Sequence, residues 1–174
     1  YGQVQRVFLE KINGMYQGAA FHFLKGFSSG NIGLMITAEG KMYTGGSNRG
    51  WGSWGTKLDS VERIDWTGKI PFEIHQMRAR PDGFELTFTH PIDPASAKPS
   101  SFLCSAYTYR YSKGYGSPEL ENIEPEIEVT SVAADGLSLR LKLTPLTKGH
   151  VHELGAPGLK STKGLPLLHD TAYY

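Results

Sequence analysis

The chain has 174 residues, of which 39% are hydrophobic and 20% are charged, a composition typical of a globular protein long enough to bury a core. Its formal net charge of +1, without a run of basic residues, argues against nucleic acid as a partner. The single cysteine, Cys104, cannot form an intramolecular disulfide and is expected to be a small buried residue, and no stretch approaches the length of an apolar membrane span.

Short segments with alternating apolar side chains run along the whole chain, separated by 21 glycines and 10 prolines. This pattern is typical of half-buried strands and predicts an all-β protein. The predicted strands, in chain order, are 4–12, 32–37, 41–45, 61–67, 72–80, 84–89, 127–132, 137–143, 150–154 and 171–174. Residues 81–83 and 135–136 contain Asp-Gly and are expected to be hairpin turns, and residues 93–97 one short helical turn.

A change in composition near residues 68–71 divides the chain into two predicted domains, 1–68 and 69–174. The first part is rich in glycine, whereas the second alternates more regularly and holds most of the prolines. Trp66 and Phe72 flank the boundary, and both are expected to be buried because they carry large apolar surfaces.

Three motifs follow one another in the second part: FTHPID at 88–93, LTPLTKG at 143–149 and KSTKGLPL at 160–167. Their order resembles the bacterial immunoglobulin-like domains of surface and secreted proteins. The resemblance implies an immunoglobulin-like β-sandwich for residues 69–174. The alternating residues are expected to supply two sheets, each with an apolar face: Phe84, Leu86 and Phe88 in one strand, and Leu137, Leu139, Leu141 and Leu143 in another.

Residues 16–53 resemble a late propeller blade of bacterial sugar dehydrogenases of the sorbosone and glucose type. Glu39-Gly40 matches the turn of that blade, and residues 42–45 match its (L/M)-Y-x-G strand. The combination is similar to large secreted proteins of planctomycete-like bacteria, in which a propeller runs into a β-sandwich and often onward to a cytochrome c domain. It implies a propeller-blade-like segment at 1–68, a secreted or periplasmic location, and a neighbouring propeller or cytochrome domain as partner.

The stretch NRGWGSWG at 48–55 places Trp51 and Trp54 on a backbone rich in glycine. If this stretch closes a blade, at least one of the two rings is expected to be buried. Alternatively, both rings could lie open as a platform for a sugar. The preferred prediction is blade packing, because the glycines also let the backbone fold the rings inward.

Tyr107, Tyr109 and Tyr111 alternate with other residues, so on a strand all three phenols would line one face. An exposed aromatic row binds sugar rings, whereas a buried row is core. The core interpretation is preferred, because the insert 112–125 resembles a lid over one end.

Two other groups could bind metal. His150 and His152 lie two apart on a predicted strand and would share one face, but no third ligand is nearby in the sequence. The acidic residues form a second group: Glu119, Glu121, Glu124, Glu126 and Glu128. They lack the spacing of a calcium loop and are expected to be a solvated patch, so neither metal nor cofactor is predicted.

Two classes of function fit these observations. The first is a non-catalytic accessory or binding module, for a carbohydrate or a partner domain, within a secreted multidomain oxidoreductase-like protein. The alternative is part of a quinone- or metal-dependent sugar dehydrogenase whose site is completed by blades absent from this chain. A propeller needs several blades, and the sequence offers no acid/base pair, so no catalytic residue is assigned and the binding module is preferred.

Overall fold

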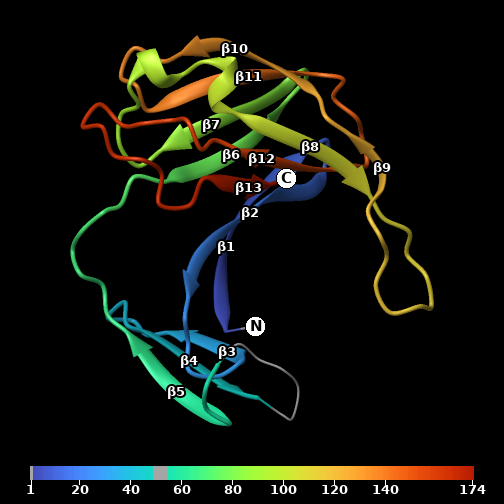
Figure 1. Cartoon of the computed structure of the whole chain (residues 1–174). Coiled ribbons are helices and arrows are strands. Elements are labelled where there is room, and N and C mark those ends of the chain that lie inside the picture. The colour runs from blue at the N-terminus through green and yellow to red at the C-terminus, as the bar shows by residue number, and fades with distance from the viewer. Residues whose placement is uncertain (1, 49–54) are drawn as a thin grey trace. The chain divides into compact units, whose positions relative to one another are not determined.

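The protein is all-β, as predicted, and its strands form three antiparallel sheets (Figure 1). The computed structural model describes residues 2–48 and 55–174. Its helical elements are two 3-10 turns, η1 (Pro94–Ser96) and η2 (Pro99–Ser101). Within the described ranges, no helical segment has the length and apolar character needed to cross a lipid bilayer.

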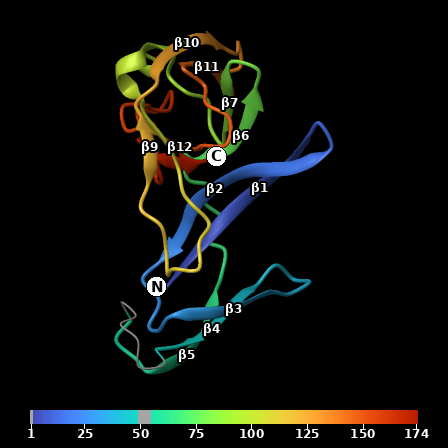
Figure 2. The same cartoon turned by 90° about the vertical axis from the view of Figure 1, so that its right-hand side faces the viewer.

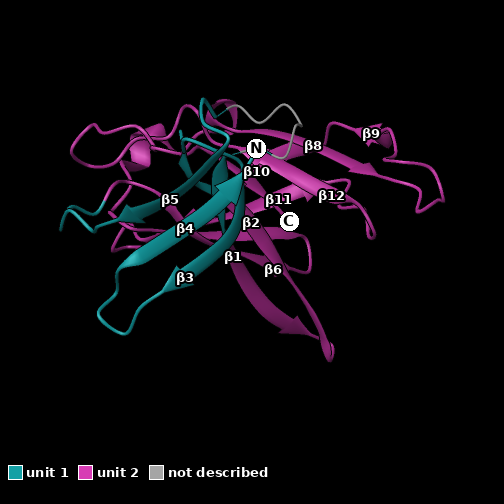
Figure 3. Cartoon of the chain, turned by 90° about the horizontal axis from the view of Figure 1, so that it is seen from below, with its two compact units in different colours: residues 1–6, 22–70 teal, residues 7–21, 71–174 magenta. Residues whose placement is uncertain are grey.

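The chain forms two compact units (Figure 3). One comprises residues 1–6 and 22–70, and the other comprises residues 7–21 and 71–174. The change of unit after Ile70 lies close to the composition shift in the sequence. Residues 7–21 belong to the second unit, and their hairpin pairs with residues 172–173 near the end of the chain.

The first unit contains a three-stranded sheet in the order β3 (Asn31–Ile36), β4 (Met42–Ser47), β5 (Asp59–Ile64). Gly40 has a φ of +77° in the turn that joins β3 to β4, a conformation that favours glycine. Several apolar side chains of this sheet are exposed: Ile32, Leu34, Met35, Ile36 and Val61. Trp66 is 65% exposed, so its predicted burial is wrong, whereas Phe72 in the second unit is buried as expected.

The second unit is a sandwich of two sheets. One is six-stranded, in the order β1 (Gln3–Ile12), β2 (Met15–Lys25), β13 (Thr171–Tyr173), β12 (Val151–Gly155), β8 (Leu103–Thr108), β9 (Leu120–Ile123). Of β1 and β2, the second unit includes residues 7–12 and 15–21. The other is four-stranded, in the order β10 (Glu126–Val132), β11 (Ser138–Thr144), β7 (Gly83–Phe88), β6 (Ile74–Arg80). The predicted turns join β6 to β7 and β10 to β11, and η1 falls within the predicted helical turn. β2, β8 and β9 were not among the predicted strands.

The core lies between these sheets and contains the six residues expected there: Phe84, Leu86, Phe88, Leu139, Leu141 and Leu143. However, β7 and β11 are neighbours in one sheet, with Leu86 opposite Leu139, so the expectation that they supply two apposed sheets is wrong. The opposite apolar face comes mainly from the six-stranded sheet: Phe21, Cys104, Leu154 and Ala172. Leu137 precedes β11 and is 39% exposed. Cys104 is buried as predicted.

The first and third of the motifs that resemble immunoglobulin-like domains meet through backbone contacts. Ile92 forms a β-bridge with Ser161, and the Thr162 amide donates to the Pro91 carbonyl at 2.9 Å. The Ile92 amide donates to the carbonyl of Gly136 at 2.9 Å. Gly136 has a φ of +69°, and a Cβ there would press on Pro91. These contacts bring the turn at Gly136, the segment 91–93 and the loop around Ser161 together in space.

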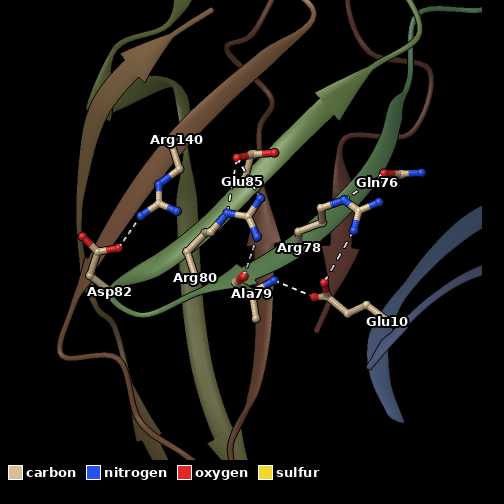
Figure 4. A network of polar contacts seen from close by, with 8 residues as sticks. All are labelled: Glu10, Gln76, Arg78, Ala79, Arg80, Asp82, Glu85 and Arg140. Atoms are coloured by element: carbon tan, nitrogen blue, oxygen red, sulfur yellow. Dashed lines mark hydrogen bonds and ion pairs between the residues drawn. The ribbon is translucent and has the colours of Figure 1, made fainter. Parts of the chain in front are cut away.

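A buried carboxylate links β1 of one sheet to β6 of the other (Figure 4). The side chain of Glu10 is 8% exposed, and its Oε1 accepts hydrogen bonds from the Ala79 amide and the Tyr174 hydroxyl, each at 2.7 Å. Its Oε2 lies 3.8 Å from the Arg78 guanidinium, which is itself 4.8 Å from the ring centre of Phe8. Burial, followed by the contact with Glu10, raises the pKa of Tyr174 above its usual range.

Replacing Phe88 by alanine should lower the free energy of unfolding by about 3 to 5 kcal/mol, because it removes a ring that packs 5.9 Å from Phe72 and leaves a cavity. Urea denaturation followed by circular dichroism measures this loss. Leu137→Ala is the control and should cost much less, since that side chain is partly exposed. Equal stability of Phe88→Ala and the wild type would contradict the described core.

Replacing Glu10 by alanine should cost about 2 to 4 kcal/mol of unfolding free energy, because it leaves the Ala79 amide and the Tyr174 hydroxyl without their acceptor. Glu128→Ala provides the comparison, since the exposed pair of Glu128 with Lys142 at 3.5 Å should contribute at most about 0.5 kcal/mol. If chemical denaturation gave the Glu10 and Glu128 variants the same stability, the hydrogen bonds of Glu10 would not contribute to the stability of the fold.

Candidate functional site

The three predicted tyrosines do not share one strand. β8 ends at Thr108, which pairs with Leu120 of β9, so Tyr107 alone lies on the strand. Tyr109 and Tyr111 lie beyond it and are 62% and 97% exposed. The expectation of one row of phenols is therefore wrong, and so is its interpretation as core for these two residues.

The connection between β8 and β9, residues 109–119, presents its tyrosines to solvent. Figures 1 and 2 show it extending beyond the ends of the two strands. Tyr115 is fully exposed, and the hydrogen bonds within the loop involve serine, as in the Arg110 amide that donates to Ser117 Oγ at 3.1 Å. We call residues 109–119 the tyrosine loop. Of the expected lid at 112–125, residues 120–123 are instead the edge strand β9.

Alternation along the six-stranded sheet turns a second set of tyrosines away from the core. Ala106, Leu154 and Ala172 are buried, so their strand neighbours point outward. Tyr107 lies opposite Val151 of β12, and Glu153, two residues further along β12, lies opposite Tyr173 of β13. Glu153 therefore lies directly opposite Tyr173 on one side and diagonal to Tyr107 on the other. We call these three residues the tyrosine face.

The carboxylate of Glu153 influences both phenols. The Tyr173 hydroxyl donates to Glu153 Oε1 at 3.4 Å. Burial, followed by Glu153 and then by the phenol of Tyr107, raises the pKa of Tyr173. Burial, followed by Glu119 and then by Glu153, raises the pKa of Tyr107. The face thus combines two neutral hydroxyl groups and two aromatic rings with a hydrogen-bond acceptor between them.

Glu153 and Tyr173 were missed as site residues in the sequence. Both fall within predicted strands, so the alternation of side chains already indicated that they point away from the core. What was missing was the strand order, because only the pairing of β8, β12 and β13 brings Tyr107, Glu153 and Tyr173 together.

The two predicted histidines lie on the core side of the sheet. His152 is 4% exposed and packs 5.4 Å from the ring of Phe84, and burial lowers its pKa. The side chain of His150 is 6% exposed, and its Nε2 lies 3.6 Å from Glu121 Oε2. Across residues 2–48 and 55–174, no group of three His, Cys, Asp or Glu side chains is placed to hold a metal ion.

The acidic stretch is divided between two sheets. Glu121 lies in β9 of the six-stranded sheet, whereas Glu126 and Glu128 lie in β10 of the four-stranded sheet. Glu128 pairs with Lys142 across the strands. Trp51 and Trp54 lie outside the described residues, so their packing or exposure stays a prediction.

No protein-family model matches this sequence, and no curated protein is similar to it. Among solved structures, the chain is similar to surface layer protein SbsC, domains 1–6, with 23% sequence identity and a TM-score of 0.45. The likeness covers 60% of this chain and 14% of that chain. Such a distant likeness carries no argument about function.

Replacing Glu153 by glutamine should lower the pKa of Tyr173 toward its ordinary value, because it removes a negative charge that opposes formation of the phenolate. As pH rises, Tyr173 should then lose its proton earlier in the variant than in the wild type. Carbon NMR of tyrosine labelled at Cζ measures this titration. Tyr174 is the internal control, since Glu10 rather than Glu153 affects it. Identical titration of Tyr173 in both proteins would refute the contact.

Proposed function

We propose that this chain is a non-catalytic carbohydrate-binding module, and that sugars bind at the tyrosine face together with the tyrosine loop. The observation that carries the proposal is the placement of Glu153 between Tyr107 and Tyr173 on the outward side of the six-stranded sheet. It offers aromatic surface and polar groups on rigid strands.

The chemistry of this surface suits saccharides. The CH groups of a sugar ring pack on an aromatic ring, while its hydroxyl groups both donate and accept hydrogen bonds. Tyr107 and Tyr173 supply the rings and neutral hydroxyls, and Glu153 supplies an acceptor beside them. The two tyrosines are half-buried, so their rings are partly held in place before a ligand arrives.

The tyrosine loop adds adaptable surface beside this rigid face. Tyrosine, serine and glycine make up most of residues 109–117, and this composition is typical of binding loops that combine large contact area with flexible polar groups. Glu119, at the end of the loop, contributes to the raised pKa of Tyr107, which supports proximity between the loop and the face.

The module is proposed to work within a secreted multidomain oxidoreductase-like protein, beside a propeller or cytochrome domain. The sequence resemblance of residues 16–53 supports this context. The exposed apolar side chains of the three-stranded sheet also support a neighbouring domain, since apolar surface of this kind commonly marks a protein contact.

Tyr107→Ala and Tyr173→Ala should each weaken sugar binding by about 5- to 10-fold, the loss expected when one stacking ring is removed. The wild-type chain is first screened against soluble forms of cellulose, chitin, xylan, starch, β-1,3-glucan and galactan by affinity gel electrophoresis. Isothermal titration with an oligosaccharide of the retained polymer then measures the affinities.

Tyr16→Ala is the control, because Tyr16 is 74% exposed and lies at the start of β2, away from the pairing of Tyr173 with Ala20. Circular dichroism checks that every variant is folded. Failure of all six polysaccharides to retard the wild type, or equal affinity of the Tyr107 and Tyr173 variants and the wild type, would overturn the proposal.

A further inference from the structure

Glu153 is the one charged side chain among the outward residues of β8, β12 and β13. The others on these described strands are neutral: Leu103, Ser105, Tyr107, Val151, Gly155, Thr171 and Tyr173. None of the ion pairs between described residues involves Glu153. The face therefore carries a negative charge without a paired cation.

An unpaired carboxylate between two aromatic rings restricts the ligand by charge. A sugar hydroxyl or ammonium group that approaches Glu153 can donate a hydrogen bond to it. A uronate carboxylate or a sulfate cannot donate, and it meets a like charge at a surface whose neighbouring groups are mostly apolar or neutral. Glu119, at the end of the tyrosine loop, adds a second negative charge toward Tyr107.

We propose that the tyrosine face selects neutral and amino sugars and rejects polysaccharides that carry carboxylates or sulfates. This selectivity rests on the proposed function, since it concerns the same surface. Two cations, Arg110 and Lys113, lie in the exposed tyrosine loop rather than on the strands. These two cations would favour anionic ligands. The preference of the whole chain for neutral or anionic polymers therefore tests whether the tyrosine face or the tyrosine loop determines the charge selectivity.

The test uses polymers that share a backbone and differ in charge. Dextran is compared with carboxymethyl-dextran and diethylaminoethyl-dextran, and hydroxyethyl cellulose with the corresponding carboxymethyl and diethylaminoethyl forms. The same substitutions are made on any polymer that the wider screen retains. Affinity gel electrophoresis gives a dissociation constant for each polymer with the wild type, Glu153→Gln and Lys113→Gln.

For the wild type, the carboxymethyl form should bind at least about 10-fold more weakly than the neutral form, and added salt should reduce this difference. Glu153→Gln should reduce this ratio of dissociation constants at least about 3-fold, which is roughly half of its logarithm. It should also weaken binding of the diethylaminoethyl form. Lys113→Gln should leave the difference unchanged or widen it.

The possible failures are distinct. Binding of a carboxymethyl polymer as tight as that of its neutral form, or an unchanged difference in Glu153→Gln, would overturn the charge selection while sugar binding itself stands. Absence of binding to every neutral polymer would overturn the proposed function, and the charge selection with it.

Discussion

The apolar face of the four-stranded sheet has to be covered, and this requirement determines which side of the six-stranded sheet meets solvent. Leu86, Leu139 and Leu141 are almost completely buried, so the facing strands must present apolar residues to them. Because side chains alternate with a period of two, burial of Cys104, Leu154 and Ala172 turns their neighbours outward. A shift of one residue in register would bury Glu153 and expose the core.

The edge of the sandwich imposes a second constraint. β1 and β6 are terminal strands of their sheets, and a terminal strand has backbone groups that no neighbour satisfies. Glu10 satisfies one of these groups, the Ala79 amide, and holds the Tyr174 hydroxyl with the same oxygen. The beginning and the end of the second unit are thus joined at the edge where its two sheets would otherwise separate. This arrangement keeps β13, and Tyr173 with it, in position beside β12.

Local features of the fold could be predicted from the sequence, and long-range features could not. Asp135-Gly136 indicated a turn, and Gly136 has the positive φ that such turns favour. Asp82-Gly83 also marked a turn, although Gly83 itself begins β7, and the alternation of Phe84, Leu86 and Phe88 indicated a buried face. The pairing of the strands could not be predicted. β7 and β11 have equally apolar faces, and nothing in either segment indicates whether they pair within one sheet or face one another across the core.

The same limitation explains the errors at the site. Tyr109 and Tyr111 continue the alternation of β8, but a strand continues only while it has a pairing partner, and the last pair is Thr108 with Leu120. β2 was missed because Gly18, Ala19 and Ala20 weaken its apolar pattern. In the sequence, Glu153 is a single carboxylate between a histidine and a leucine, a pattern that does not indicate a binding site. Its importance comes from Tyr173, which is distant along the chain and adjacent in the sheet.

In the proposed binding module, the tyrosines on the strands and those in the tyrosine loop contribute to recognition in different ways. The half-buried tyrosines on β8 and β13 lose little conformational freedom when a ligand binds, so contacts with them translate more fully into affinity. The exposed tyrosines of residues 109–119 must be ordered by the ligand, which offsets part of the energy that their large surfaces contribute. Discrimination between ligands should therefore reside on the strands, where Glu153 holds a charge at a defined position, while the loop mainly enlarges the contact.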